Sequence, residues 1–307
     1  MVIWISGATG LIGTALSQVL SRDFHTIFRL IRPGKAPGAT DFSKPCNVSD
    51  LPWDAATGPS GVEAEFTPEV IINLAGASIA EASWTPARKA ELRQSRIAST
   101  RSLVEALREM PVQPRAFLSA SAIGFYGDRG EEELTEESAP GRDFLAELAQ
   151  EWEAEARRAE EFGVRVVLMR FGIVLAKQGG ALPKMAKPFR FGVGGKIGSG
   201  RQWMSWVALP DVVGAVKFFL AHPEISGPVN VVAPNPSRNS DFAKALGHAL
   251  HRPAIVPAPA FALRFLLGAE MANALLLSSQ RVLPKKLQQT GYQFLYPELP
   301  AALAASL

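Results

Sequence analysis

The sequence predicts an α/β protein in which a doubly wound parallel sheet is followed by a smaller, mostly helical C-terminal lobe. Strand-like and helix-like segments alternate over the first 170 residues, which is typical of βαβ units and a parallel sheet. From residue 239 onward the apolar spacing is mostly helical. At 307 residues, with 47% hydrophobic and 20% charged residues, the chain is long enough for one large or two unequal domains.

The chain opens with a glycine-rich connection between a strand and a helix. Val2–Ile5 is a buried apolar run, and Leu11–Leu20 shows helical apolar spacing. Between them, Gly7, Gly10 and Gly13 form a G-x-x-G-x-x-G pattern. The first glycine permits a tight turn, the second a close approach to a pyrophosphate, and the third close packing of the helix on the strand. A glycine-rich turn without a ligand is the alternative. The context favours a Rossmann-like fold, with a dinucleotide bound by Gly7, Ala8, Thr9, Gly10, Leu11, Ile12 and Gly13.

Periodicity and capping signals place the later elements. Strands are expected at His25–Ile31, Val70–Leu74, Arg115–Ser119, Arg165–Arg170 and Val229–Val232. Helices are expected at Pro86–Met110 with Thr85 as cap, at Phe144–Phe162, at Leu209–Leu220, from a capping Asn239 to Leu250, at Phe261–Leu267 and at Met271–Leu277. Residues 177–206 are expected to form an extended loop or lid. We therefore assign 1–176 to a dinucleotide-binding domain to which 207–234 returns, and 177–206 with 235–307 to a substrate-binding lobe.

The region after the second expected strand bears on the choice of nucleotide. In NAD-binding sheets an acidic residue about 20 positions beyond the glycines binds the ribose 2′-hydroxyl. No Asp or Glu occurs between Asp23 and Asp41. The interval instead carries Arg29, Arg32 and Lys35. Arg32 ends the strand, where its guanidinium can meet a 2′-phosphate. This favours NADP(H) over NAD(H); surface cations beside a turn are the alternative.

The charge is unevenly distributed, although the net charge of +3 is too small to argue for a nucleic-acid partner. Residues 128–161 carry thirteen acidic and four basic residues, most simply a solvated helix face. Residues 177–201 carry six basic residues and no acidic one. That segment is either a solvated loop or part of a pocket that attracts an anionic substrate.

The compartment is indicated by cysteine content and by the lack of targeting signals. Cys46 is the single cysteine, which excludes an internal disulfide and suits a reducing compartment. No basic residue precedes Arg22, so the apolar start is read as a strand and not as a signal peptide. No apolar run approaches the length of a membrane span. We expect a cytoplasmic protein without a membrane partner.

Several segments resemble the extended short-chain dehydrogenase/reductase superfamily, on its NAD-dependent epimerase/dehydratase side. They are the glycine turn, Asn73–Gly76, Ser119–Ser121 and Tyr126–Gly127. More narrowly, the chain is similar to epimerase-family proteins that end in a short C-terminal domain of unknown function. The matching segments are 72–76, 84–89, 119–129, 198–206, 226–230 and 279–284. Besides the glycine turn and Arg32, the resemblance implies a cofactor site that includes Leu74, Ala75, Gly76, Ser119 and Arg170.

The catalytic pattern of that superfamily is incomplete in this chain. Its active members use a Tyr as general acid/base and a Lys four residues later, on one helix face beside the nicotinamide ribose. None of the three tyrosines has a lysine at that spacing, and no lysine occurs between Lys89 and Lys177. Ser121 matches the superfamily's Ser/Thr position, and Tyr126 lies five residues beyond. We predict that Ser121 and Tyr126 orient or protonate a carbonyl while NADPH supplies hydride. The alternative is that Tyr126 only lines the cofactor cleft.

Substrate contacts are expected from the segment 198–206, which in sugar-nucleotide enzymes of the superfamily binds the substrate diphosphate. Arg201 offers a planar fork for phosphate or carboxylate, and Trp203 and Trp206 offer flat surfaces for a ring. The two tryptophans would alternatively pack the two lobes together. Asp211, just after Pro210, is interpreted as a helix-capping residue.

These features predict an NADP(H)-dependent oxidoreductase or epimerase acting on a carbonyl or a nucleotide-linked, sugar-like substrate. The substrate is expected to be a small anion, with no metal ion and no nucleic acid involved. Homodimers through the helices expected at Pro86–Met110 and Phe144–Phe162 are common in the superfamily. The alternative is a non-catalytic NADP(H)-binding redox sensor or interaction protein, which the missing Tyr/Lys pair favours.

Overall fold

A parallel sheet forms the centre of the molecule in the computed structural model, which describes residues 1–32, 47–54, 58–59 and 67–307. Its strands are β1 (Val2–Ser6), β2 (Thr26–Ile31), β3 (Val48–Asp54), β4 (Gly58–Pro59), β5 (Val70–Asn73), β6 (Ala116–Ala122), β8 (Arg165–Phe171) and β12 (Gly227–Val231). The spatial order is β12-β8-β6-β5-β1-β2-β3-β4. All neighbours pair in parallel except β4, which is antiparallel to β3. The chain therefore has the predicted Rossmann-like, doubly wound fold.

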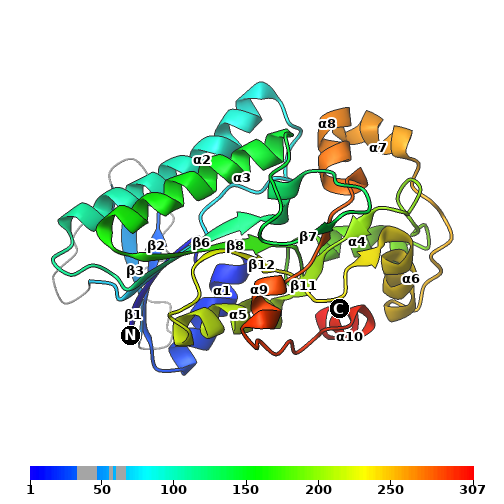
Figure 1. The fold of residues 1–307 in the computed structure, drawn as a ribbon. Helices are drawn as coiled ribbons and strands as arrows, with labels where there is room; N and C mark the ends of the chain where they lie inside the picture. The colour runs from blue at the N-terminus through cyan, green and yellow to red at the C-terminus, as the bar shows by residue number, and fades with distance from the viewer. Residues whose placement is uncertain (33–46, 55–57, 60–66) are drawn as a thin grey trace.

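Helices cover both faces of this sheet (Figure 1). The helices α1 (Leu11–Arg22) and α5 (Leu209–Ala221) pack together on one face, and α2 (Pro86–Ala106) and α3 (Phe144–Arg157) pack together on the other. Successive side chains of a strand point to opposite faces. Ile3 and Ile5 accordingly join the core beneath α1 and α5, while Trp4 joins the core beneath α2. Burial on both faces explains why these strands are continuously apolar.

The observed helix boundaries agree with the predicted ones to within a few residues. Two residues that were expected to cap a helix, Asn239 and Asp211, do not cap one. Thr85 caps α2, because its Oγ1 accepts the Arg88 N–H at 3.1 Å. Single 3₁₀ segments extend α2 to Glu109 and α3 to Phe162. Asn239 is not a cap but the first residue of its helix, and its Oδ1 accepts the Ile197 N–H. Asp211 also caps nothing: its carboxylate accepts two N–H groups from the C-terminal segment, those of residues 295 and 296.

Short elements make up most of the remaining described chain, and the majority of them lie in residues 177–206 and 235–307, the predicted C-terminal lobe. They are β7 (Glu133–Leu134), β9 (Ile173–Leu175), α4 (Leu182–Arg190), β10 (Trp203–Met204), β11 (Trp206–Ala208), β13 (Ser237–Arg238), α6 (Asn239–Ala249), α7 (Ala260–Leu267), α8 (Ala269–Ala272), β14 (Arg281–Val282), α9 (Lys285–Gln289) and α10 (Leu299–Ser306). A π-helical turn, Asn273–Leu277, follows α8. Residues 177–206, expected to be an extended loop, instead contain α4 and two short strands. The strand β11 pairs with β9, and β10 pairs with β13.

Among the helices that the structure describes, none is long and apolar enough to cross a membrane. The described residues likewise contain no cluster of His, Cys, Asp and Glu side chains able to hold a metal ion.

Candidate functional site

The glycine turn between β1 and α1 has the geometry that a dinucleotide-binding turn requires. Gly7 has a φ of +65°, which favours glycine. A Cβ on Gly7 would lie 2.5 Å from the Leu74 carbonyl oxygen, and one on Gly13 would lie 2.4 Å from the Gly7 carbonyl oxygen. Larger residues at these two positions would therefore push β5 and α1 away from the turn. Gly10 directly precedes α1, so the free N–H groups of that helix begin at the turn.

A buried polar network holds the strand ends beneath this turn. The Ser6 hydroxyl donates to Asn73 Oδ1 at 2.7 Å and accepts the Leu74 N–H at 3.2 Å. The Asn73 amide donates to Thr100 Oγ1 at 2.8 Å and to Ser119 Oγ at 3.3 Å. Ser119 has no exposed surface. Its side chain supports the turn from below and cannot reach a cofactor, which corrects its predicted role as a direct ligand.

The other predicted cofactor residues differ in exposure. Thr9, Gly10, Gly76 and Arg32 are exposed, Gly7, Leu11, Ile12 and Leu74 are partly buried, and Ala8, Gly13 and Ala75 are buried. Arg32 directly follows β2, at the carboxyl edge of the sheet. Arg29 faces elsewhere, since it binds both carboxylate oxygens of Asp50, at 2.7 and 3.1 Å. Lys35 and Cys46 lie outside the described residues.

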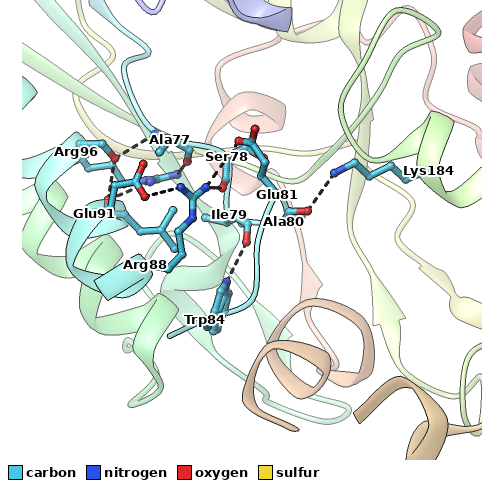
Figure 2. A network of polar contacts seen from close by, with 12 residues as sticks. Ala77, Ser78, Ile79, Ala80, Glu81, Trp84, Arg88, Glu91, Arg96 and Lys184 are labelled. Atoms are coloured by element: carbon cyan, nitrogen blue, oxygen red, sulfur yellow. Dashed lines mark hydrogen bonds and ion pairs between the residues drawn. The ribbon is translucent and has the colours of Figure 1, made fainter. Parts of the chain in front are cut away.

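The loop that follows β5 has four consecutive carbonyl groups, each bound by a side chain (Figure 2). Arg96 donates to Ala77 at 3.0 Å, and Arg88 donates to Ser78 at 2.5 Å. Trp84 donates to Ile79 at 2.9 Å, and Lys184 of α4 donates to Ala80 at 3.0 Å. We call residues 77–80 the clamped loop. Because ligands of such sheets bind beyond the carboxyl ends of the strands, this loop is fixed at the margin of the expected cofactor cleft.

Arg96 is the most buried of the cations at the clamped loop. Its guanidinium lies 5.2 Å from the Trp152 ring centroid, and a Cβ on Gly76 would lie 3.2 Å from Arg96 Cζ. Burial, together with the neighbouring Arg88, lowers the pKa of Arg96 to about 10, so it remains charged at neutral pH. Of the three cations, only Arg88 falls in a segment that carries the family resemblance, 84–89, whereas no pattern in the sequence indicates Arg96 or Lys184, whose backbone partners lie 19 and 104 positions away.

Ser121 and Tyr126 belong to a second buried network, centred on an ion pair. Arg170 binds both carboxylate oxygens of Glu153, at 2.7 and 2.8 Å. The Ser121 hydroxyl donates to Glu153 Oε1 at 2.7 Å. The Tyr126 hydroxyl accepts from Arg170 at 2.9 Å and donates to Asn230 Oδ1 at 2.7 Å. The five side chains have at most 5% of their surface exposed. We refer to them as the buried ion-pair network.

This arrangement corrects two predicted roles. Tyr126 has no exposed surface, and its hydroxyl is occupied as both donor and acceptor. Burial raises the pKa of Tyr126 to about 12 against the opposing effect of Arg170, so it is a poor proton donor near neutral pH. Arg170 is enclosed between Glu153 and the Phe125 ring, whose centroid is 3.5 Å from its Cζ. It is therefore an internal counter-ion and not a cofactor contact.

A cavity of about 570 Å³ lies beside the segment 198–206. Its lining comprises Glu131, Lys196, Ser199, Gly200, Arg201, Arg238 and Ser240. Glu131 pairs with Arg238 at 2.7 Å and thereby neutralises one of the three cations. Lys196 and Arg201 form no ion pair within the described part of the chain. The cavity thus combines hydroxyl donors with an excess of positive charge, which suits an anionic group.

The two tryptophans of this segment have different positions. Trp203 is half-buried, its Nε1 donates to Glu131 at 3.0 Å, and Arg238 and Arg281 lie over its ring at 4.2 and 4.7 Å from the centroid. Trp206 is fully buried in the core of the C-terminal lobe. Its predicted contact with substrate is therefore wrong, and its packing role is the one observed. Arg201 lines the cavity, and Trp203 contacts two of its lining residues, Glu131 and Arg238; contact of Arg201 and Trp203 with a substrate stays a prediction.

Comparisons with known proteins agree with this architecture. Residues 3–232 match the NAD dependent epimerase/dehydratase family, and residues 258–306 match a domain of unknown function. An epimerase family protein of Mycobacterium leprae is 37% identical, with 99% of this chain and 94% of that protein covered. The crystal structure of the human epimerase family protein SDR39U1 with NADPH superimposes with a TM-score of 0.87 at 32% identity, covering 100% of this chain and 99% of that one.

A third similar protein is described as a nucleoside-diphosphate sugar epimerase from Corynebacterium glutamicum. It has a TM-score of 0.76 at 33% identity and covers 99% of this chain, which spans 57% of that longer chain. The glycine turn, the sheet order and these matches lead to one conclusion. The chain belongs to the NAD dependent epimerase/dehydratase family and carries the C-terminal domain of unknown function found beside it.

Proposed function

We propose that the protein is an NADP(H)-dependent oxidoreductase or epimerase whose substrate carries a carbonyl or hydroxyl group and an anionic group, such as a nucleotide-linked sugar. The glycine turn is the observation that carries the proposal. Side chains at Gly7 and Gly13 would collide with backbone, and Thr9 and Gly10 remain exposed, so the turn fits a pyrophosphate. Because Cys46 is the single cysteine, we place this activity in the cytoplasm.

The cavity beside 198–206 supports an anionic substrate. Lys196 and Arg201 would bind a phosphate or carboxylate group, with Ser199 and Ser240 as hydroxyl donors. The Corynebacterium protein is described as acting on nucleoside-diphosphate sugars, and we extend that substrate class to this chain. A bound nicotinamide would supply or accept hydride, while the cavity would hold the charged end of the substrate.

In this proposal the Ser121 hydroxyl acts as a hydrogen-bond acceptor toward the substrate. Glu153 is paired with Arg170, and the Ser121 hydroxyl donates its hydrogen bond to Glu153 Oε1. Ser121 therefore has only its lone pairs left for a further hydrogen bond. It would orient a substrate hydroxyl by accepting its hydrogen bond, and a carbonyl would need another proton source, such as water.

One observation favours the alternative function of a non-catalytic NADP(H)-binding sensor. The chain lacks the Tyr/Lys pair, and Tyr126, the tyrosine nearest to Ser121 in sequence, is sealed in the buried ion-pair network. A sensor would bind the cofactor tightly without oxidising or reducing it.

The first experiment measures the binding of NADPH and NADH by nicotinamide fluorescence. We expect tighter NADPH binding, and we expect Arg32→Ser to weaken NADPH binding by about tenfold or more through loss of a charge-assisted hydrogen bond. NADH binding should not change. Arg22→Ser, at the far end of α1, is the matched control. Equal affinities for both nucleotides would remove Arg32 from the cofactor site, and binding of neither would overturn the proposed function.

A second experiment separates enzyme from sensor. The complexes with NADPH and with NADP+ are each mixed with a panel of carbonyl compounds and nucleotide-linked sugars. The change in nicotinamide absorbance reports net reduction or oxidation of a substrate, and the configuration of the recovered sugars reports epimerisation, in which the hydride returns to the substrate. Substrate-dependent redox change or epimerisation, abolished or weakened by Arg201→Ala, supports the enzyme. Tight binding of NADPH without turnover across the panel supports the sensor.

A further inference from the structure

The C-terminal lobe exposes an unusual number of large apolar side chains. Seven of the ten exposed large hydrophobic residues in the described chain lie in residues 191–193, in residues 255–256 or on α7. Phe191, Ile255 and Phe261 are 75, 78 and 75% exposed, and Phe265 and Leu266 are 89 and 72% exposed. The helix α7 contains no buried residue at all. Scattered apolar residues on a surface are normal, whereas a concentration of this kind marks an interaction site.

The three segments adjoin one another. The Val256 N–H donates to the Gly194 carbonyl at 3.1 Å, and the Gly198 N–H donates to the Ala258 carbonyl at 2.8 Å. The chain then enters α7 directly at Ala260. In Figure 1, the segment that connects α6 to α7 lies with these two helices at the end of the molecule opposite β3. We call residues 190–193, 252–256 and α7 the apolar tip.

The charged side chains of the apolar tip itself are all basic, and the acidic residues that flank it, Asp241 of α6 and Glu270 of α8, are paired with Lys244 and Lys89. No acidic residue occurs in residues 177–201 or 242–269, while the first range has six basic residues and the second has Lys244, Arg252 and Arg264. Lys187, Arg190, Arg252 and Arg264 are exposed. Their side chains form no ion pair within residues 67–307. The partner of this surface must therefore offer apolar volume together with negative charge.

We propose that the apolar tip binds peripherally to the surface of an anionic lipid bilayer. A short helix with exposed Phe and Leu side chains and flanking arginines has the composition of an interfacial membrane anchor. Five of the seven side chains project from a helix and two loops at more than 70% exposure, so they can insert individually among acyl chains. The surrounding cations would attract anionic headgroups. Such binding needs no membrane-spanning helix and is compatible with the absence of one among the described helices.

A second copy of the chain is a less suitable occupant. Two copies would bring basic surfaces together, which is unfavourable. In the superfamily, dimers form through the helices that correspond to α2 and α3. In this chain neither helix carries any of the exposed large hydrophobic residues of the described residues, so the apolar tip is not continuous with such a dimer surface.

The test is co-sedimentation of the full chain with phosphatidylcholine vesicles that contain or lack about 30% phosphatidylglycerol. We expect binding to the anionic vesicles, little binding to pure phosphatidylcholine, and release in about 0.5 M salt. The double variant Phe261→Ser and Phe265→Ser should lower the bound fraction about tenfold or more, because insertion scales with buried apolar area. Phe24→Ser, which is 93% exposed at a distant site, is the control and should bind like the wild type.

Two results would overturn the proposal. One is absence of binding to anionic vesicles by wild-type protein that binds NADPH and is therefore folded. The other is a concentration-dependent dimer in vesicle-free buffer that the double variant abolishes, which would assign the apolar tip to a second copy. Neither result bears on cofactor binding, so the proposed function is tested separately.

Discussion

Arg170 shows how a single buried charge organises the interior of the candidate site. Its guanidinium connects Glu153, and through it Ser121, with Tyr126 and Asn230. Burial alone would lower the pKa of Arg170, but its hydrogen bonds to Glu153 raise it, so Arg170 stays charged. A buried pair need not add net stability, yet removing one partner is costly because the other charge is left uncompensated.

Replacement of Glu153 by Gln should therefore destabilise the protein strongly. We expect Glu153→Gln to lower the free energy of unfolding by about 3–5 kcal/mol, measured by urea denaturation. Glu151→Gln, two positions earlier on the exposed side of α3 and paired with Arg93, is the control and should cost at most about 1 kcal/mol. Equal effects of the two changes would contradict the assignment of Glu153 as the counter-ion of Arg170.

Removal of the Tyr126 hydroxyl tests whether that residue is structural or catalytic. Tyr126→Phe leaves an Arg170 N–H and Asn230 Oδ1 without their partner and should cost about 1–3 kcal/mol of stability. NADPH affinity and any turnover found should be unchanged at temperatures where the variant is folded. Tyr296→Phe, which removes a less buried hydroxyl, is the matched control. A stable but inactive Tyr126→Phe protein would return Tyr126 to the mechanism.

At the scale of the elements, the sequence predicted the regular parts of the fold because their periodicity reports burial directly. The glycine turn and the strands buried on both faces were placed to within a few residues. The short strands of the C-terminal lobe were missed, since two- and three-residue pairings such as β10 with β13 are defined by distant partners and leave no periodic signal.

The direction in which the side chains of the candidate site point was harder to predict from the sequence than the positions of the helices and strands. Glu153 lies in an acidic stretch interpreted as a solvated face, yet Ala149, Trp152 and Ala156 are buried on the same side of α3. Their helical spacing was the available signal that Glu153 points inward. No comparable pattern distinguishes Trp206 from Trp203, because the core of the C-terminal lobe is assembled from segments far apart in sequence.

The cavity beside 198–206 makes a testable electrostatic prediction. Glu131→Gln would leave Arg238 without its carboxylate and should strengthen sulfate binding by no more than several-fold, because exposed charges interact weakly. Arg201→Ala should weaken it. Isothermal titration calorimetry measures both. Unchanged sulfate affinity in both variants would show that the cavity does not bind anions.

The same cavity should show a flat pH dependence. Hydrogen bonds from Arg238 and Trp203 lower the pKa of Glu131 from 4.5 to about 2. A carboxyl whose pKa is lowered by folding keeps its ion pair above the unfolded pKa and loses it as the pH falls through the folded value. Sulfate affinity should therefore be constant from about pH 5 to 8 and rise only toward pH 2. A step between pH 5 and 8 would contradict the assignment.

At the scale of the whole molecule, two of the contacts between the predicted C-terminal lobe and the rest of the chain lie beyond the carboxyl edge of the sheet. Lys184 of α4 holds the clamped loop at Ala80, and Lys89 of α2 pairs with Glu270 of α8 at 2.5 Å. The residues of the second contact are 28 and 50% exposed. Exposed ion pairs contribute little to stability and are weakened by salt. They can therefore open without unfolding either lobe.

These contacts should slow the exchange of a bound cofactor. We expect Glu270→Gln to increase the dissociation rate of NADPH several-fold while changing the free energy of unfolding by less than about 1 kcal/mol, because only the closed arrangement of the lobes is weakened. Stopped-flow displacement of NADPH measures the rate. High salt should accelerate release from the wild type but have a smaller effect on Glu270→Gln, in which the ion pair is already lost. Release that is equally fast and equally salt-dependent in both proteins would show that the cofactor leaves without separation of this contact, and the lobes would then act as one rigid unit.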